Sequence, residues 1–135
     1  VLDVGCGEGA LLECMRQSGS LVPYLGIDIS ETAIKKAQML FPSEQFTPMD
    51  VELPQLKDQF DVIVFNEILY YVDAKKVLYA YRPFLARGGV VIISMYRSWR
   101  TRILWFLVKK VLRIECIHEL PKHRIGVFSS PALQP

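Results

Sequence analysis

The chain has 135 residues, of which 51% are hydrophobic and 22% are charged; it is long enough for one hydrophobic core and too apolar for a disordered segment, a low-complexity linker or a collagen-like repeat. Its formal net charge of +2 is unevenly distributed, because residues 1–96 carry eight basic and twelve acidic side chains whereas residues 97–135 carry eight and two. We therefore expect one domain, residues 1–135, with a mildly acidic body and a basic end.

Short apolar runs alternate with helical patterns over the first two thirds of the chain. Strands are predicted at residues 1–4, 24–29, 45–50, 60–65 and 90–95. The first helical pattern begins at Ala10, the second follows Ser30 as N-cap and stops at Phe41, and the third follows Asp73 as N-cap. The apolar stripe of the third helical pattern extends to Leu85, and Pro83 is expected to bend or end its last turn. Such an alternation predicts an α/β domain with a mostly parallel sheet.

The last third of the chain is less regular. One helical face is marked by apolar residues at helical spacing, namely Ile103, Leu104, Leu107, Val108 and Val111. Residues 113–120 and 124–133 are predicted as two further strands joined at Pro121 and Lys122.

Residues 97–113 carry six basic side chains and no acidic one. We favour a solvated helix face beside a buried stripe of Ile103, Leu107 and Val111. The alternative is a surface for an anionic partner, such as RNA or a lipid headgroup, bound through Arg100, Arg102, Lys109 and Lys110.

Cysteine and histidine positions indicate neither a disulfide framework nor a metal site. Cys6, Cys14 and Cys116 are odd in number and form no Cys-x-x-Cys pair, which favours a reducing, cytoplasmic location. No uncharged run is long enough to suggest a membrane span. His118 and His123 fall in the irregular end and are interpreted as surface or turn residues.

The opening stretch carries the strongest chemical signal. Gly5, Gly7 and Gly9 follow a strand and open a helix, an arrangement that brings bare backbone N–H groups to a ligand. Asp28 lies nineteen residues after Gly9, at the end of the second predicted strand, where a carboxylate can bind the ribose hydroxyls. Together these features predict a nucleoside-type ligand.

The glycine spacing and Asp3 favour S-adenosylmethionine over a nicotinamide dinucleotide as the ligand. The third glycine comes one residue earlier than in the dinucleotide pattern, and Asp3 precedes the turn by two residues. A carboxylate there repels a pyrophosphate and suits an ammonium group, which S-adenosylmethionine has. A nicotinamide-dependent oxidoreductase is the disfavoured alternative.

The motifs LDVGCGEG, YLGIDIS, FTPMDVELP, FDVIVFNEILYYV and LARGGVVIISMY together resemble, in order, those of the class I S-adenosylmethionine-dependent methyltransferases. The resemblance implies a Rossmann-like, doubly wound, mostly parallel seven-stranded sheet with an antiparallel last hairpin, here without the helices that usually precede the first strand. It implies cofactor contacts from Asp3, Gly5, Cys6, Gly7, Gly9, Asp28, Ile29, Asp50, Val51 and Asn66. NEILYYV and WRTRILWFLVKKVLRI are also similar to small-molecule methyltransferases of the nodulation-protein type.

Membership of that family implies methyl transfer by in-line displacement to a nitrogen, oxygen or carbon atom of a small molecule. Positioning and exclusion of water then dominate catalysis, without a metal. Asn66, Glu67, Tyr70 and Tyr71 are expected at the acceptor end, with Glu67 and Tyr70 as candidate catalytic residues. The alternative is that Glu67 pairs locally while the tyrosines pack under the loop.

A non-enzymatic interpretation is a third alternative, beside the methyltransferase and the nicotinamide-dependent oxidoreductase. The basic end could serve an RNA- or membrane-associated binding module built on a degenerate methyltransferase core, although the intact glycines and acids argue against degeneracy. Nothing in the sequence indicates an oligomeric state.

Overall fold

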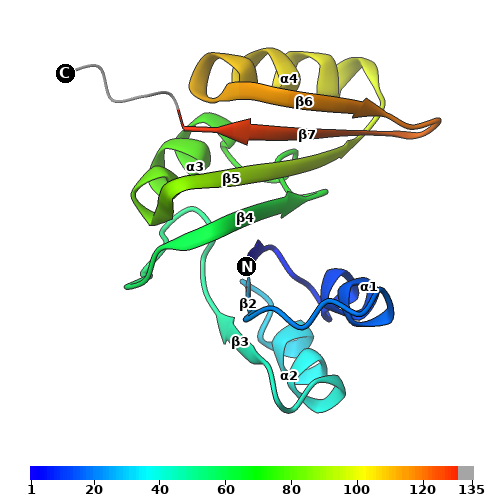
Figure 1. The fold of residues 1–135 in the computed structure, drawn as a ribbon, viewed down its shortest axis with the longest axis vertical. Helices are drawn as coiled ribbons and strands as arrows, with labels where there is room; N and C mark the ends of the chain where they lie inside the picture. The colour runs from blue at the N-terminus through cyan, green and yellow to red at the C-terminus, as the bar shows by residue number, and fades with distance from the viewer. Residues whose placement is uncertain (131–135) are drawn as a thin grey trace.

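The structure, a computed structural model that describes residues 1–130, is built on one seven-stranded sheet (Figure 1). The strands lie in the order β3 (Gln45–Pro48), β2 (Leu25–Asp28), β1 (Leu2–Val4), β4 (Phe60–Asn66), β5 (Leu85–Tyr96), β7 (His123–Ser129) and β6 (Arg113–Glu119). The first five in this order are parallel, and β7 is antiparallel to both of its neighbours. The predicted parallel sheet with an antiparallel last hairpin is confirmed.

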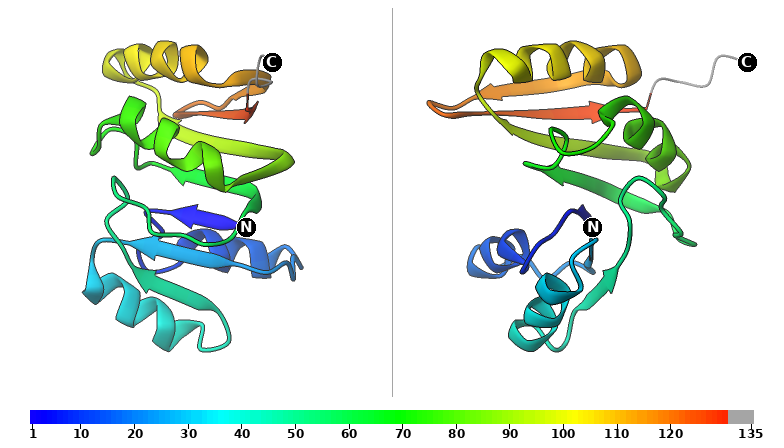
Figure 2. Two further views of the ribbon diagram at one scale, coloured as in Figure 1. Left: turned by 90° about the vertical axis from the view of Figure 1, so that its left-hand side faces the viewer. Right: turned by 180° about the vertical axis from the view of Figure 1, so that it is seen from behind.

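Four α-helices are found among the described residues: α1 (Ala10–Gln17), α2 (Glu31–Leu40), α3 (Ala74–Tyr81) and α4 (Trp99–Val111). Both predicted N-caps are confirmed, because the Ser30 hydroxyl accepts the N–H of Ala33 at 3.2 Å and the Asp73 carboxylate accepts that of Lys76 at 3.0 Å. Figure 2 shows α2 beside β3 at one end of the sheet and α4 beside β6 at the other. None of the helices within residues 1–130 has the length and apolarity needed to cross a bilayer.

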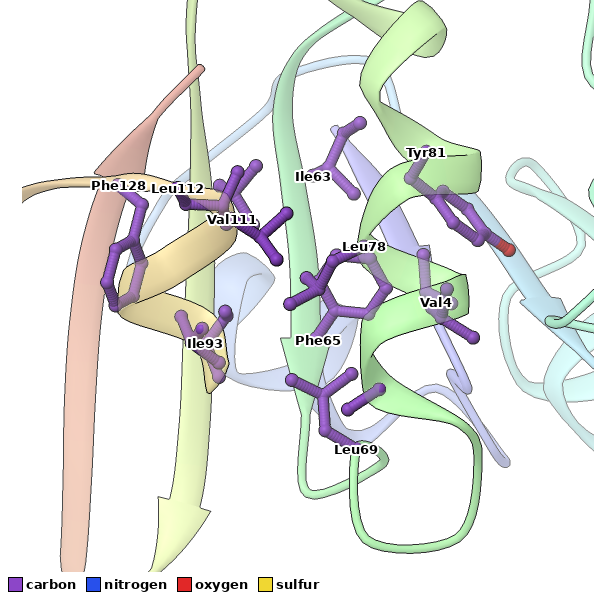
Figure 3. Packing of buried hydrophobic residues seen from close by; sticks show 14 of the residues in the cluster. Val4, Ile63, Phe65, Leu69, Leu78, Tyr81, Ile93, Val111, Leu112 and Phe128 are labelled. Carbon is purple, nitrogen blue, oxygen red and sulfur yellow. The ribbon is translucent and has the colours of Figure 1, made fainter. Parts of the chain in front are cut away.

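The two faces of the sheet carry separate cores. Alternation along β1 sends Leu2 and Val4 into the larger core, which α3 and α4 cover (Figure 3). The other face packs against α1 and α2 through a smaller cluster formed by Cys6, Leu12, Tyr24, Ile34, Ala37 and Phe46. Helices on both faces make the fold doubly wound, as expected.

Two details of the predicted third helix and fifth strand differ in the structure. The helix ends at Tyr81 and continues as the 3₁₀ turn η1 (Arg82–Phe84), so Pro83 does end it as predicted. Leu85, however, was assigned to the helical stripe and instead begins β5, where it pairs with Phe60. The register then shifts, and Val62 pairs with Val90. Gly88, with φ of +79°, lies in this bulge.

The predicted buried face of the basic helix is confirmed at Val111 and wrong at Ile103, and Leu107 is only partly buried. Ile103 is 60% exposed, whereas Trp105 is only 3% exposed and stacks on Phe128 of β7 with ring centroids 6.0 Å apart. Val108 and Val111 share the buried face with Trp105. Docking the large indole on β7 turns the helix so that Ile103 faces away from the core.

The hairpin at the end of the described chain follows the prediction closely. β6 and β7 flank the predicted joint at Pro121 and Lys122, and β7 starts at His123 rather than at residue 124. The third strand is shorter than expected and ends at Pro48. Residues 131–133 of the last predicted strand lie outside the described residues.

Candidate functional site

The glycine turn between β1 and α1 is fastened to the neighbouring strand. The N–H groups of Gly5 and Cys6 both donate to the carbonyl oxygen of Ile27 on β2, at 2.8 and 3.0 Å. Gly7 has φ of +55°, and a Cβ built on it would meet nothing within 4 Å. The backbone at Gly7 therefore adopts a conformation that favours glycine and leaves open space above it, which is what close approach of a ligand requires.

Asp28 is held against this turn by two backbone donors. Its Oδ2 accepts the N–H of Gly7 at 2.9 Å and its Oδ1 accepts that of Ser30 at 2.8 Å. Since β1 and β2 are adjacent and parallel, their carboxyl ends share one edge of the sheet. The turn and the acid predicted to act together are thus in contact, and each carboxylate oxygen keeps a further lone pair for a hydroxyl group.

Asp3 lies beneath the turn, in the smaller core rather than at its surface. The carboxyl group is 2% exposed; Tyr24 donates its hydroxyl to Oδ2 at 2.7 Å. Oδ1 has no hydrogen-bond partner among residues 1–130. Burial raises the pKa of Asp3 to about 6, with the Tyr24 hydrogen bond acting in the opposite direction and the Asp28 charge adding to the rise. An unsatisfied buried acceptor next to the glycine turn is a place where a cationic group gains an electrostatic partner.

The side chain of Cys6 faces the same smaller core. Burial is the main cause that raises the pKa of its thiol to about 12, so the thiol stays protonated and unreactive. Its backbone is used within the turn, because its carbonyl oxygen accepts the N–H of Gly9 at 3.0 Å. Cys6 thus contributes a small side chain that fits the turn.

The loop after β3 lies against the end of β2. The Met49 N–H donates to the carbonyl oxygen of Asp28 at 2.9 Å, which places residues 49–51 beside the Asp28 edge. Asp50 is exposed and Oδ1 of its carboxylate accepts the Glu52 N–H at 2.9 Å. The Val51 side chain is buried in the larger core, so only its backbone faces outward. Ile29, just after β2, is 70% exposed.

Glu67 follows β4 in a strained backbone conformation. Its φ of +56° makes it the one non-glycine residue among residues 1–130 with a positive φ. The carboxylate reaches across to β5, where the Ser94 hydroxyl donates to Oε1 at 3.0 Å and the Tyr96 N–H donates to Oε2 at 3.1 Å. Glu67 therefore bridges the ends of the neighbouring strands β4 and β5.

Two tyrosines accompany Glu67 at this edge. Tyr70 accepts the same Tyr96 N–H through its hydroxyl oxygen at 3.2 Å, which leaves its own O–H proton available to another group. Tyr71 contacts Tyr70 edge to face at 5.3 Å and is 78% exposed, so it does not pack under the loop. Asn66 ends β4 and is exposed.

His123 is the residue of this cluster that the sequence did not reveal. It was interpreted as a surface or turn histidine away from the motif strands, yet it pairs with Tyr96 in the β5–β7 register. Its Nε2 lies 3.9 Å from Oε1 of Glu67, and its ring meets that of Tyr96 edge to face at 5.4 Å. The only sequence signal was its position one residue before the strand predicted at residues 124–133. His118 remains exposed on β6, as expected.

Comparison with known proteins gives a consistent family and fold. A family described as a methyltransferase domain matches residues 2–93. Ubiquinone biosynthesis O-methyltransferases from Idiomarina loihiensis and Thiobacillus denitrificans are 36% and 39% identical over 110 and 102 residues, covering 73% and 70% of the chain. The chain spans less than half the length of these relatives, 44% and 43%.

Solved structures share the fold at lower identity. The N-methyltransferase NodS from Bradyrhizobium japonicum superimposes with a TM-score of 0.79 at 19% identity, covering 96% of this chain and 84% of NodS. A TehB-like methyltransferase from Corynebacterium glutamicum gives 0.78 at 20% identity, covering 96% and 79%. These likenesses extend over the sheet, including its last hairpin.

Proposed function

The chain belongs to the methyltransferase domain family, and from that premise we propose that residues 1–135 bind S-adenosylmethionine at the glycine turn and transfer its methyl group to a hydroxyl oxygen of a small molecule. The observation that carries the proposal is the contact between Asp28 and Gly7 beside open backbone. A nucleoside ligand needs both an acid for its ribose and a main chain that it can approach.

The residues at the turn fit the chemical groups of this cofactor. Asp28 has lone pairs for the two ribose hydroxyls, and Ile29 offers an exposed apolar side chain next to it. Asp3 supplies a buried negative charge for the amino group, and its unpartnered Oδ1 is the observation that favours a cationic ligand. Asp50 and the backbone of Val51 are proposed to meet the adenine, because their loop is tied to Asp28.

When bound, S-adenosylmethionine supplies an electrophilic methyl group on a positively charged sulfur. The protein then has to orient the acceptor and receive a proton from it. Glu67 is suited to receive that proton, since the Ser94 and Tyr96 donors hold its carboxylate at the ends of β4 and β5. Tyr70 can donate its O–H to the acceptor, and His123 can pair with Glu67.

Two considerations support an oxygen acceptor. The relatives from I. loihiensis and T. denitrificans are named O-methyltransferases that act in ubiquinone biosynthesis. A hydroxyl group must also lose its proton when it is methylated, and a fixed carboxylate at the acceptor end meets that requirement. We propose a small hydroxylated aromatic compound as the acceptor.

Isothermal titration with S-adenosylmethionine and its demethylated product tests the cofactor site. Asp28→Ala is expected to weaken binding about 10- to 100-fold, the range that corresponds to losing hydrogen bonds to a charged group. Asp58→Ala removes an exposed acid elsewhere and is the matched control, with affinity unchanged. Thermal unfolding of each variant checks that the fold is intact. Absence of binding by the unmodified chain, or equal binding by Asp28→Ala, contradicts the proposal.

A further inference from the structure

The outer face of α4 carries an apolar stripe that the core does not use. Trp99, Ile103 and Phe106 are 71%, 60% and 58% exposed. Their spacing of four and three residues places them on one side of the helix, opposite the buried Trp105, Val108 and Val111. A soluble helix of this length normally has one apolar face, whereas α4 has two.

Cations flank this stripe on both sides. Arg100, Arg102, Lys109 and Lys110 form no ion pair with any of residues 1–130, and α4 contains no acidic residue. Two of these side chains lie on the stripe itself, with the Arg100 guanidinium 5.3 Å from the Trp99 ring centroid and the Lys110 ammonium 4.5 Å from that of Phe106. The surface therefore combines exposed hydrocarbon with unneutralised positive charge.

A hollow of about 600 Å³ lies beside the stripe, between α4 and the hairpin. Arg97, Arg102, Lys109 and Arg124 line it. Glu119 pairs with Arg97 and Arg124, at 3.6 and 2.5 Å, and its charge acts on Lys109 without a direct ion pair. Arg102 and Lys109 therefore have no direct acidic partner within the described part of the chain and can meet an anion from outside. A phosphate group fits such a position by charge.

We propose that α4 docks this protein on an anionic phospholipid surface, with Trp99, Ile103 and Phe106 in the interfacial layer and Arg102 and Lys109 on lipid phosphates. Helices that lie in a membrane interface have this composition, with aromatic and aliphatic side chains bordered by Lys and Arg. The inference is independent of the proposed methyl transfer, because none of these five residues belongs to the glycine turn or to the Glu67 cluster.

A nucleic acid fits the same surface less well. Single strands bind when successive bases stack on exposed aromatic rings. Here the stripe places the aliphatic Ile103 between its two aromatic residues, and cations already lie against both rings. Hydrocarbon chains make no such demand for free ring faces, so the stripe matches lipid better.

The start of α4 lies close in the chain to a residue that binds Glu67. Trp99 starts the helix three residues after Tyr96, whose N–H binds Glu67. Figure 1 shows the start of α4 at the end of the sheet toward which β4 and β5 point. The helix that carries the docked face therefore begins near the end of the sheet at which Glu67 lies.

Sedimentation with vesicles of phosphatidylglycerol and phosphatidylcholine, against vesicles of phosphatidylcholine alone, measures the interaction. We expect binding to the anionic vesicles that weakens as salt is raised. Arg102→Gln with Lys109→Gln is expected to weaken partitioning about 25-fold, or about fivefold for each charge removed. Lys57→Gln with Lys75→Gln changes the net charge equally at exposed sites elsewhere and should leave partitioning unchanged.

Tryptophan fluorescence tests whether the stripe enters the interface. The sequence contains two tryptophans, and Trp105 is buried, so a blue shift on adding anionic vesicles reports Trp99 and should be lost in Trp99→Phe. Ile103→Ser with Phe106→Ser should weaken binding, whereas Leu21→Ser with Met39→Ser, at side chains that are more exposed and lie outside α4, should not.

Three outcomes would overturn the proposal. The first is no preference for anionic vesicles. The second is binding without a Trp99 blue shift, which would mean that the stripe stays in water. The third is tighter binding to a single-stranded RNA oligonucleotide than to vesicles at equal salt, which would assign the surface to nucleic acid.

Discussion

Asp3→Asn tests whether a buried carboxyl group is kept beneath the glycine turn at a cost in stability. The pKa of Asp3 is raised from 3.8 to about 6, mainly by burial. In the folded protein it therefore holds its proton between about pH 4 and pH 6, where the unfolded chain has lost it. The contribution of Asp3 to the free energy of unfolding therefore falls as pH rises through this window, by about 3 kcal/mol in total.

Asn has nearly the same shape and cannot ionise, and its amide oxygen can still accept the Tyr24 hydroxyl. We expect Asp3→Asn to be more stable than the unmodified chain at pH 7.5, by up to about 3 kcal/mol, and to match it near pH 4. Urea unfolding at the two pH values measures the difference, and Asp58→Asn, at an exposed acid, serves as control. Parallel pH profiles for Asp3→Asn and the unmodified chain would refute the reasoning.

The same carboxyl group links stability to the proposed cofactor. An ammonium group beside Asp3 stabilises its ionised form, so binding of S-adenosylmethionine at pH 6 should release about half a proton. Titrations in two buffers with different ionisation enthalpies measure this release. Asp3→Asn should bind more weakly and release no proton from this position, and an unchanged release would assign the proton to another group.

Two further predictions concern α4 and Glu67. Trp105→Ala should lower the free energy of unfolding by about 3–5 kcal/mol, because it removes the buried contact with Phe128. Trp99→Ala, at an exposed position, should change the free energy of unfolding by less than about 0.5 kcal/mol, and denaturant unfolding of both variants measures the difference. Glu67→Gln should lower the rate of methyl transfer to a catechol by about 100-fold or more, measured by radiolabel transfer, because the variant cannot receive the acceptor's proton. Its affinity for S-adenosylmethionine, measured by calorimetry, should stay the same. Equal rates for the variant and the unmodified chain would remove Glu67 from the proposed chemistry.

Local rules explain why so much of the parallel part of the fold was predictable. Ser30 and Asp73 accept N–H groups only three residues ahead of them, so their capping role depends on nearby sequence alone. Parallel neighbouring strands also bring their carboxyl ends to one edge wherever they start. That rule alone brings Asp28 to the glycine turn, as the observed contact with Gly7 shows.

Long-range pairing decided what the sequence left open. The β5–β7 register places His123 opposite Tyr96 and so beside Glu67, although 56 residues separate the two side chains in the sequence. Periodicity placed several apolar residues of α4 on one face, but the stacking of Trp105 on Phe128 selected which side was buried. That choice exposed Ile103 and created the stripe proposed to dock on lipid.

The sequence by itself determined the order of strands and helices, the glycine turn, its partner Asp28 and the basic end, because each follows from residue type, spacing or the rule that parallel strands end together. Only the tertiary structure decided the burial of Asp3, the position of His123 and the outward face of α4. These three depend on the register and packing of segments far apart in the chain, whose free energies are set by contacts that no local pattern encodes.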